Sequence, residues 1–434
     1  MLAPSASATL ESWLTYLELL HPKTIALGLD RVDEVRSRMG LTLNCPVITV
    51  AGTNGKGSTA AMLERILNCA RYRVGCYTSP HLSRFNERVR IAGIEATDAA
   101  LTTALAEVER ARAVTPLTYF EFTTLAAICL FRSSAVDVAV LEVGLGGRLD
   151  AVNVFDADCS VLTNVALDHQ DYLGPDREAI GREKAGVFRA AKPAICADPD
   201  PPASVLRAAL ELDADLRLLG RDFGFAADAM QWSWWGRDTK RPGLSYPALR
   251  GSNQLVNAST ALAALESVAS KLPVSAQEIR DGFATVTLAG RFQVLPGRPA
   301  VVLDVAHNPH AAAVLADNLG SQGYFTRTIA VFGMLADKDI SGVARALVHR
   351  VDVWHCGGLP GVRGTSGEAV AQILAATGVV HATAHANIAA AFSAARGEAG
   401  ENDRIIVFGS FLTVAEVAKL VASGRETGPA RNAS

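Results

Sequence analysis

A glycine-rich turn between a strand and a helix is the clearest chemical signal in the chain. Residues 51–58 read Ala-Gly-Thr-Asn-Gly-Lys-Gly-Ser and follow an apolar run, Pro46–Ala51, that predicts a buried strand. Backbone N–H groups of such a turn, and the dipole of the helix after it, point at a phosphate chain. Lys56 would reach the β- and γ-phosphates, and the Ser58 hydroxyl would coordinate magnesium. The predicted nucleotide contacts in the turn are Asn54, Gly55, Lys56, Gly57 and Ser58.

The turn departs from the common phosphate-binding pattern G-x-x-x-x-G-K-[ST]. Val50 stands where that pattern has its first glycine, and Gly57 stands where serine or threonine follows the lysine. This departure argues against a generic nucleotide hydrolase. A glycine turn with an incidental lysine is the structural alternative, and the strand before it and the helix after it disfavour that alternative.

Polar residues also follow two other predicted strands. Glu142 lies in the apolar run Val136–Val143, where a lone carboxylate is unfavourable unless it is paired or metal-bound. His169 comes after the run Cys159–Val165, where an imidazole would bind magnesium, steer a ligand or serve only the structure. Ser79 is a further oxygen ligand or an ordinary turn serine. Because ligands of open α/β sheets lie beyond the carboxyl ends of the strands, these residues are candidates for one site.

The composition is that of an ordinary α/β globular protein. Of 434 residues, 49% are hydrophobic and 20% are charged, and this length predicts two domains. The net charge of −3 supplies no positive field for nucleic acid, so we expect no such partner. The seven cysteines lack the spacing of a metal or redox site. With no secretory signal and no apolar run long enough to cross a membrane, the sequence predicts a cytoplasmic protein with reduced thiols.

Short β-rich runs alternate with Ala- and Leu-rich helical segments, which is typical of a parallel sheet covered by helices. Further strands are expected at Val74–Tyr77 and Ala194–Ala197, and helices at Ser58–Tyr72, Val256–Ser270 and Ser275–Phe283. The segment 223–249 contains three tryptophans among turn residues. It predicts short antiparallel strands in which the indole rings pack rather than stack on a ligand.

The alternation of strands and helices restarts after a Gly- and Pro-rich stretch, which indicates a second, smaller α/β domain. Its strands are expected at Ala300–Val305, Thr328–Phe332, Val351–His355 and Ile405–Phe408. The boundary is expected between Thr287 and Gly297. We therefore predict a large P-loop domain with a mostly parallel sheet over residues 1–290 and a Rossmann-like α/β domain over residues 291–434.

Several stretches taken together closely resemble the folate branch of the Mur-ligase superfamily. They are Gly52–Ser58, Ser79–His81, Leu117–Glu121, Leu141–Asp150, Asp168–His169, Gly181–Gly186, Gly290–Gln293 and Asp304–His310. The resemblance extends from about Leu17 to Val421. It implies an ATP-dependent carboxylate–amine ligase that adds L-glutamate to dihydropteroate and to reduced folates, within folate biosynthesis and one-carbon metabolism.

The resemblance also implies a metal site. Two Mg²⁺ ions would be held by Ser58, Ser79, Glu142 and His169, and Lys184 would carry a carbamate. The lysine alone would be interpreted as a surface charge, whereas a carbamate is an anion able to organise the metal site. The implied catalytic residues are Lys56, Glu142, His169, Lys184 and His307.

Other matched positions imply the nucleotide and folate contacts. Asn257, Arg291 and Asp304 match the nucleotide contacts of the family, which would place ATP between the domains, and His307 would contact phosphate or glutamate. Asp30 replaces the usual Glu in a Leu-Gly-Leu-Glu element. The implied pteridine contacts are Leu27, Gly28, Leu117, Thr118, Tyr119, Phe120, Leu149, Asp150 and Ala151.

The expected reaction starts with attack of the pteroate carboxylate on the γ-phosphate of ATP, which gives an acyl phosphate. The amino group of glutamate then displaces phosphate, and Lys56 with Mg²⁺ spreads the transition-state charge. The two alternative functions are a peptidoglycan Mur-type ligase and a GTPase-like switch. The chain ahead of Gly52 is too short for a UDP-binding domain, and no N-K-x-D element follows a strand. A hinged two-domain enzyme of this kind is expected to be a monomer.

Overall fold

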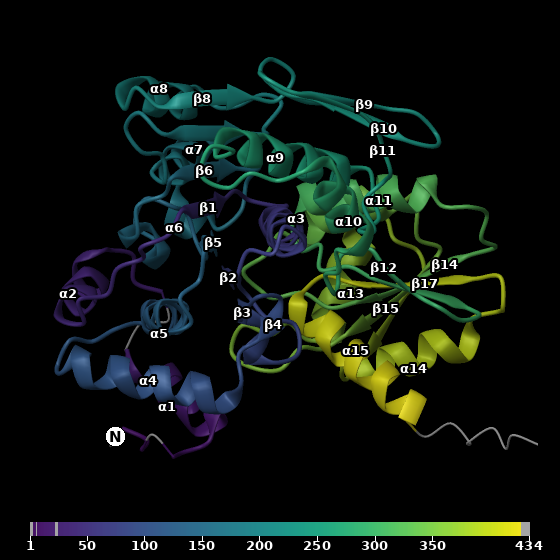
Figure 1. Cartoon of the computed structure of the whole chain (residues 1–434). Coiled ribbons are helices and arrows are strands. Elements are labelled where there is room, and N and C mark those ends of the chain that lie inside the picture. The colour runs from purple at the N-terminus through teal and green to yellow at the C-terminus, as the bar shows by residue number, and fades with distance from the viewer. Residues whose placement is uncertain (1–2, 6, 22–24, 427–434) are drawn as a thin grey trace, which may run out of the picture. The chain divides into compact units, whose positions relative to one another are not determined.

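The computed structural model describes residues 3–5, 7–21 and 25–426 (Figure 1). Their packing divides them into two compact units. The first runs up to Ala248 and resumes over Asn253–Thr287, and the second comprises Leu249–Ser252 and the described residues from Leu288 onward. The division after Thr287 falls at the start of the Gly- and Pro-rich stretch and three residues before the expected 290/291 boundary.

The first unit is built on an eight-stranded sheet in the order β4-β3-β2-β5-β1-β6-β7-β8. The strands from β2 to β8 in this order pair in parallel, and β3 and β4 are antiparallel additions at one edge. The central strands β5, β1 and β6 are buried along their whole length. The strands are β1 Val47–Ala51, β2 Val74–Tyr77, β3 Val89–Ile91, β4 Ile94–Glu95, β5 Val138–Glu142, β6 Cys159–Leu162, β7 Pro193–Cys196 and β8 Asp215–Leu218.

Helices cover this sheet, and α3 lies beside α9 and α10 (Figure 1). Polar N-caps fix the starts of several helices. At the start of α5, the Thr118 hydroxyl accepts a hydrogen bond from the backbone N–H of Glu121, and the Glu121 carboxylate accepts one from the backbone N–H of Thr118. The helices are α1 Leu10–Leu20, α2 Asp30–Arg38, α3 Lys56–Cys69, α4 Asp98–Arg112, α5 Tyr119–Ser133, α6 Gln170–Leu173, α7 Arg177–Ala185, α8 Ala203–Glu211, α9 Asn253–Ser267 and α10 Ala276–Thr285. Two short 3₁₀ helices are η1 Phe85–Arg88 and η2 Ala151–Val154.

A separate three-stranded antiparallel sheet completes the first unit, formed by β9 Gly224–Ala227, β10 Trp232–Trp235 and β11 Lys240–Leu244. Trp232 and Trp234 are buried, and their indole N–H groups donate to the carbonyls of Ser245 and Ser259. These two of the three tryptophans therefore pack, as predicted.

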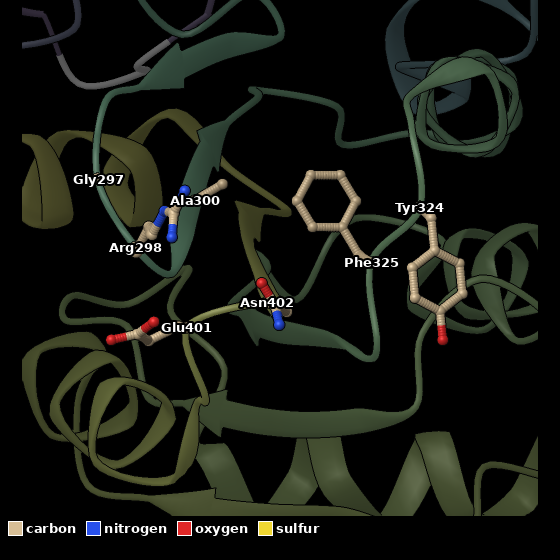
Figure 2. A pocket seen from close by; sticks show the side chains of 7 residues that line it. All are labelled: Gly297, Arg298, Ala300, Tyr324, Phe325, Glu401 and Asn402. Atoms are coloured by element: carbon tan, nitrogen blue, oxygen red, sulfur yellow. The ribbon is translucent and has the colours of Figure 1, made fainter.

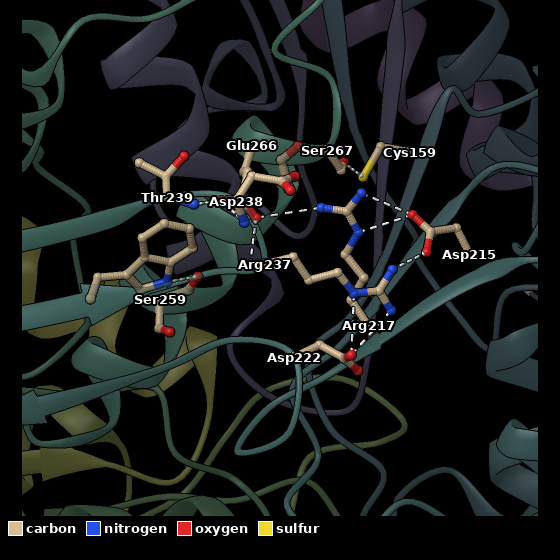
Figure 3. Close-up of polar contacts among 12 residues, drawn as sticks. Cys159, Asp215, Arg217, Asp222, Arg237, Asp238, Thr239, Ser259, Glu266 and Ser267 are labelled. Carbon is tan, nitrogen blue, oxygen red and sulfur yellow. Dashed lines mark hydrogen bonds and ion pairs between the residues drawn. The ribbon is translucent and has the colours of Figure 1, made fainter.

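An ion network fastens the three-stranded sheet to its neighbours. Arg217 of β8 pairs with Asp215 and with Glu266 of α9, while Arg237 in the turn after β10 pairs with Asp215 and Asp222 (Figure 3). The Glu266 carboxylate also accepts backbone N–H groups of that turn. The network thus ties β8, α9 and the three-stranded sheet together.

The second unit contains a six-stranded sheet in the order β12-β13-β17-β14-β15-β16, parallel except for β12 at its edge. The strands are β12 Gln293–Leu295, β13 Ala300–Leu303, β14 Thr328–Phe332, β15 Val353–Gly357, β16 Ala382–His385 and β17 Arg404–Phe408. The helices are α11 Pro309–Ser321, α12 Ile340–Leu347, α13 Gly367–Ala376, α14 Ile388–Glu398 and α15 Phe411–Glu426. The predicted fold class is confirmed, because each unit has a mainly parallel sheet with helices around it. Across the described ranges we find no helix with the length and apolar character needed to span a membrane.

Candidate active site

The glycine turn lies at the carboxyl end of β1 and is fixed by the segment after β6. Thr53 N–H donates to the carbonyl of Asn164 over 2.9 Å, and Asn54 N–H donates to the Asn164 side chain over 3.0 Å. The Thr163 hydroxyl donates to the Asn54 carbonyl over 2.6 Å. Gly52 has φ +144°, and a Cβ there would lie 1.8 Å from Thr163 Oγ1. These contacts therefore fix the turn in a conformation that leaves room only for glycine at position 52.

The second required glycine is Gly55, which caps α3 with φ +86°. A Cβ at this position would lie 2.6 Å from the side-chain oxygen of Asn257. Asn257 itself is buried and donates to Gln254 over 2.9 Å. The structure thus brings Asn257, from α9, beside the turn, while Gly57 and Ser58 occupy the first helical turn of α3. The backbone N–H groups at the start of such a helix suit the binding of a phosphate.

Two lysines converge on one backbone oxygen of the turn. Lys56 Nζ donates to the Gly52 carbonyl over 3.1 Å and to the Thr53 carbonyl over 3.2 Å. Lys184 Nζ, from α7, donates to the same Gly52 carbonyl over 3.0 Å. Burial and the neighbouring Lys56 lower the pKa of Lys184 from 10.5 to about 7. The expectation from Lys184 alone, a solvated surface charge, is wrong because the side chain is buried at the phosphate turn.

Oxygen donors gather where β5 and β2 end. The Glu142 carboxylate is 5% exposed and accepts the backbone N–H of Ser79 over 3.1 Å. Val50 pairs with Glu142 across β1 and β5, so the carboxylate lies one strand from the glycine turn. Within the described part of the chain, the Ser58 and Ser79 hydroxyls make no side-chain hydrogen bond. A buried carboxylate with two available hydroxyls is an oxygen donor set that fits Mg²⁺.

His169 caps the short helix α6 in the left-handed conformation, with φ +52°. Its Nε2 atom lies 3.9 Å from the Asp168 carboxylate, and its side chain is 32% exposed. Among the described residues, no three His, Cys, Asp or Glu side chains gather in a metal-binding group. The metal site implied by the resemblance contains only two residues of these types, Glu142 and His169, and its other ligands are serine hydroxyls. The position of His169 after β6 is compatible with the set, and its role stays a prediction.

The Gly-rich loop after β5 packs against the helix that carries Lys184. A Cβ on Gly147 would lie 2.8 Å from the Lys184 carbonyl, and Arg148 N–H donates to the Glu183 carbonyl over 2.7 Å. Asp150 is buried at the end of this loop and accepts N–H groups from Leu145 and Val152. Burial raises the pKa of Asp150 to about 7, and these N–H groups oppose the rise.

The residues implied for the pteridine are partly brought together. The Gly28 N–H donates to the Leu149 carbonyl over 3.4 Å, so the N-terminal element with Leu27 lies beside the loop that continues to Ala151. The Phe120 ring stacks at 5.8 Å on Tyr77, and a Cβ on Gly144 would lie 2.6 Å from Phe120. The Phe120 ring therefore lies against the first residue of the loop that follows β5.

Tyr119 belongs to a second aromatic group. Its ring lies 6.3 Å from Phe85, and the Arg88 guanidinium lies over both rings at 5.6 and 5.5 Å. Leu117 is fully buried in the core, and Thr118 is the N-cap of α5. Both help to position Tyr119 and Phe120.

Among the predicted contacts of the second unit, Asp304 and His307 follow the carboxyl end of β13, and Arg291 precedes the antiparallel strand β12. Asp304 follows β13 and accepts the N–H groups of Phe292 and Ala306, each over 2.8 Å. Burial raises the pKa of Asp304, while backbone N–H groups and the Arg291 guanidinium counteract the rise. His307 Nδ1 lies 2.9 Å from the Val305 carbonyl.

The sequence did not single out the residue that links this group. The ring of Phe411, the first residue of α15 after β17, lies 5.1 Å from the Arg291 guanidinium and 6.2 Å from the His307 ring. Its place after a strand on the same sheet edge was the available signal. In the first unit, no sequence motif indicates a role for Thr163, although its hydroxyl supports the glycine turn.

A pocket of about 440 Å³ lies at the opposite end of the second sheet (Figure 2). It is lined by residues that precede β13, β14 and β17, including Arg298, Phe325 and Asn402. Because these are the amino ends of the strands, the pocket is separate from the residues around Asp304.

Two family models match the chain. The Mur ligase middle domain covers residues 50–222, and the Mur ligase glutamate ligase domain covers residues 290–411. The dihydrofolate synthase/folylpolyglutamate synthase of Escherichia coli K12 is 47% identical over 426 residues, which are 98% of each chain. The enzyme of the same name from Haemophilus influenzae is 40% identical and covers 95% of this chain and 97% of its own.

Solved structures show the same likeness. E. coli FolC in complex with DHPP and ADP has a TM-score of 0.93 at 46% identity, covering 98% of this chain and 100% of its own. A bifunctional folylpolyglutamate synthase/dihydrofolate synthase with Mn, AMPPNP and L-glutamate bound has a TM-score of 0.90 at 45% identity, covering 97% and 100%.

Proposed function

The chain belongs to the dihydrofolate synthase/folylpolyglutamate synthase family of Mur-type ligases, and we propose that it performs both reactions of that family. It is an ATP-dependent ligase that adds L-glutamate to dihydropteroate, forming dihydrofolate, and to folates, forming folylpolyglutamates. The observation that carries this function is the likeness over 98% of both chains, together with a phosphate turn whose required glycines and two lysines are in place.

The reaction follows from the charges at the turn. A carboxylate resists attack by an amine because its negative charge repels the nucleophile and its oxygen leaves poorly. The pteroate or folate carboxylate therefore attacks the γ-phosphate of ATP, forming an acyl phosphate and releasing ADP. The amine of glutamate then attacks the acyl carbon, an amide forms, and inorganic phosphate leaves. Lys56 exchanges its backbone partners for phosphate oxygens and stabilises the charge of the first transition state.

A divalent cation would supply Lewis-acid stabilisation of the phosphate charge. Support for its site comes from the buried Glu142 carboxylate, the Ser79 N–H that orients it and the available Ser58 and Ser79 hydroxyls. We assign His169 to the same set and expect Mg²⁺, with two ions, as the physiological metal. The bound Mn of the structural relative supports a divalent ion.

Lys184 is proposed to carry a carbamate. Only a neutral amine reacts with CO₂, and burial beside Lys56 keeps the pKa of Lys184 at about 7, so a neutral amine is present at physiological pH. The carbamate would replace a buried cation by an anion able to accept from Lys56 and to orient the metal. This exchange would remove the repulsion between the two ammonium groups at Gly52.

The nucleotide contacts of the second unit remain part of the proposal. We assign Arg291 and Asp304 to the nucleotide and His307 to phosphate or glutamate. Their support is the group formed around Phe411 at the carboxyl edge of the sheet. The seven free cysteines support action in the reducing cytoplasm, and we expect the chain to act as a monomer.

The peptidoglycan alternative is not favoured, because the relatives that match this chain over nearly its whole length are named as folate enzymes. A direct test measures ADP release with ATP, Mg²⁺ and L-glutamate. Dihydropteroate and a tetrahydrofolate should each start ADP release, and a UDP-sugar peptide should not. ADP release that depends on the UDP-sugar peptide would support the rival ligase, and hydrolysis that ignores every acceptor would support a nucleotide switch.

A further inference from the structure

A partly buried arginine outside the predicted site connects three elements near it. Arg90 of β3 is 17% exposed at its side chain and pairs with Glu64 of α3, the helix that begins at Lys56. Its Nη2 atom donates to Glu64 Oε2 over 2.7 Å and to Cys76 Sγ over 3.3 Å, and its Nε atom donates to Glu64 over 3.0 Å. The ion pair therefore fixes β2 and β3 against the helix of the phosphate turn.

The remaining nitrogen of the same guanidinium holds the segment that precedes Ser79. Arg90 Nη1 donates to the Thr78 hydroxyl over 3.2 Å and to the Glu87 carbonyl over 2.7 Å. A guanidinium has five N–H donors in a rigid plane, and each of the three nitrogens here has a partner. The planar group thus sets the position of Thr78 relative to α3.

The far side of this loop is held by a carboxylate. Glu87 accepts the backbone N–H groups of Leu82, Ser83 and Arg84, each over 2.7 Å. Thr78 N–H donates to the Arg88 carbonyl over 2.9 Å. The loop that carries Ser79 is therefore anchored at both ends, and at Thr78 the anchor leads directly to α3.

We propose that Arg90 is a positioning residue that fixes Ser79 and Glu142 relative to Ser58, and that it thereby sets the affinity of the site for a divalent metal ion. Ser79 adjoins Thr78, its N–H orients the Glu142 carboxylate, and Ser58 lies at the start of the helix that holds Glu64. The guanidinium donates to Glu64, Cys76, Thr78 and Glu87, none of which belongs to the proposed metal set. This inference rests on the proposed function, because it concerns the metal set assigned there.

The test compares ADP binding by calorimetry in EDTA and in saturating Mn²⁺, so that the ratio of the two affinities reports the metal contribution. The variant Arg90→Lys keeps the charge beside Glu64 and loses the planar fork. We expect the ratio to fall about tenfold, as for other groups that orient metal ligands, with ADP binding in EDTA unchanged. Circular dichroism should show a folded protein.

The matched control is Arg217→Lys. Arg217 is similarly shielded, 12% exposed at its side chain, and pairs with Asp215 and Glu266 in the network of Figure 3. Its replacement should lower the unfolding temperature and leave the affinity ratio unchanged. A folded Arg90→Lys protein with the wild-type ratio, or an equal fall in Arg217→Lys, would overturn the inference.

A second variant covers the case in which Arg90→Lys does not fold. Thr78→Val removes one acceptor of Arg90 and keeps the Glu64 pair, and the ratio should fall about threefold for the loss of one hydrogen bond. An unchanged ratio in Thr78→Val would count against the inference. A wild-type protein that binds ADP no better with Mn²⁺ than with EDTA would instead contradict the proposed function.

Discussion

The replacement Lys184→Met should make the protein more stable and abolish its activity. The lysine is buried, donates to the Gly52 carbonyl and lies beside a second cation, Lys56. A methionine of similar length fills the same space without a charge. Opposite effects on stability and activity are expected where an unfavourable residue is kept for function.

The size of the gain follows from the pKa. Burial first, and Lys56 second, lower the pKa of Lys184 from 10.5 to about 7. At about 1.4 kcal/mol for each pH unit, this difference amounts to roughly 5 kcal/mol of destabilisation at pH 7. Loss of the hydrogen bond to Gly52 offsets about 1 kcal/mol of the gain. Allowing for relaxation around the new side chain, we expect a net gain of about 2–4 kcal/mol.

The pH dependence of the gain has a definite sign. The unfolded chain keeps the Lys184 proton up to about pH 10.5, whereas the folded chain releases it above about pH 7. The unfolded state therefore binds more protons between these values, and the destabilisation weakens as the pH rises. The advantage of Lys184→Met should be largest at or below pH 7 and should fall below about 1 kcal/mol at pH 10.

Urea unfolding in CO₂-free buffer, followed by circular dichroism at pH 7 and pH 10, measures this difference. The control Lys192→Met changes a half-exposed lysine that pairs with Asp158, and it should alter stability by less than about 1 kcal/mol. The reasoning would be refuted if Lys184→Met were no more stable than wild type at pH 7, or if its advantage were the same at both pH values.

Three further predictions concern single groups. With ¹³C-bicarbonate, the wild-type protein should give a carbamate signal in ¹³C NMR that Lys184→Met lacks, and its absence from wild type would contradict carbamylation. Gly52→Ala should weaken ADP binding at least tenfold, measured by calorimetry, because its Cβ would lie 1.8 Å from Thr163 Oγ1. Burial lowers the pKa of His355 and of His385, so the stability of the folded protein should fall as the pH drops below about 6.5. In His355→Gln, the midpoint of urea unfolding should fall less steeply with decreasing pH than in wild type. An unchanged slope would contradict this prediction.

The fold was largely predictable because hydrophobic runs and helix patterns are local. Thr328–Phe332 begins and ends where predicted, and Val136–Val143 shortens to β5 Val138–Glu142. The helix of the phosphate turn begins at Lys56 rather than Ser58, since Gly55 takes the capping position. Such shifts arise because strand and helix ends are set by tertiary hydrogen bonds that a sequence does not display.

The site was predictable where a motif carries its own geometry, as in the turn around Lys56. The site was not predictable where the contacts of a residue come from distant parts of the chain. The clash that requires Gly52 involves Thr163, and the anchor of Thr78 involves Arg90 and Glu64. Without the resemblance, Lys184 would have been assigned to the surface, because nothing local indicates its burial.

The central claim, activation of a carboxylate as an acyl phosphate at the glycine turn, is tested most directly by isotope transfer. Dihydropteroate labelled with ¹⁸O in its carboxylate is incubated with ATP, Mg²⁺ and L-glutamate, and the released phosphate is examined by mass spectrometry. One labelled oxygen should appear in each phosphate formed with dihydrofolate. Product formation with unlabelled phosphate would contradict the account.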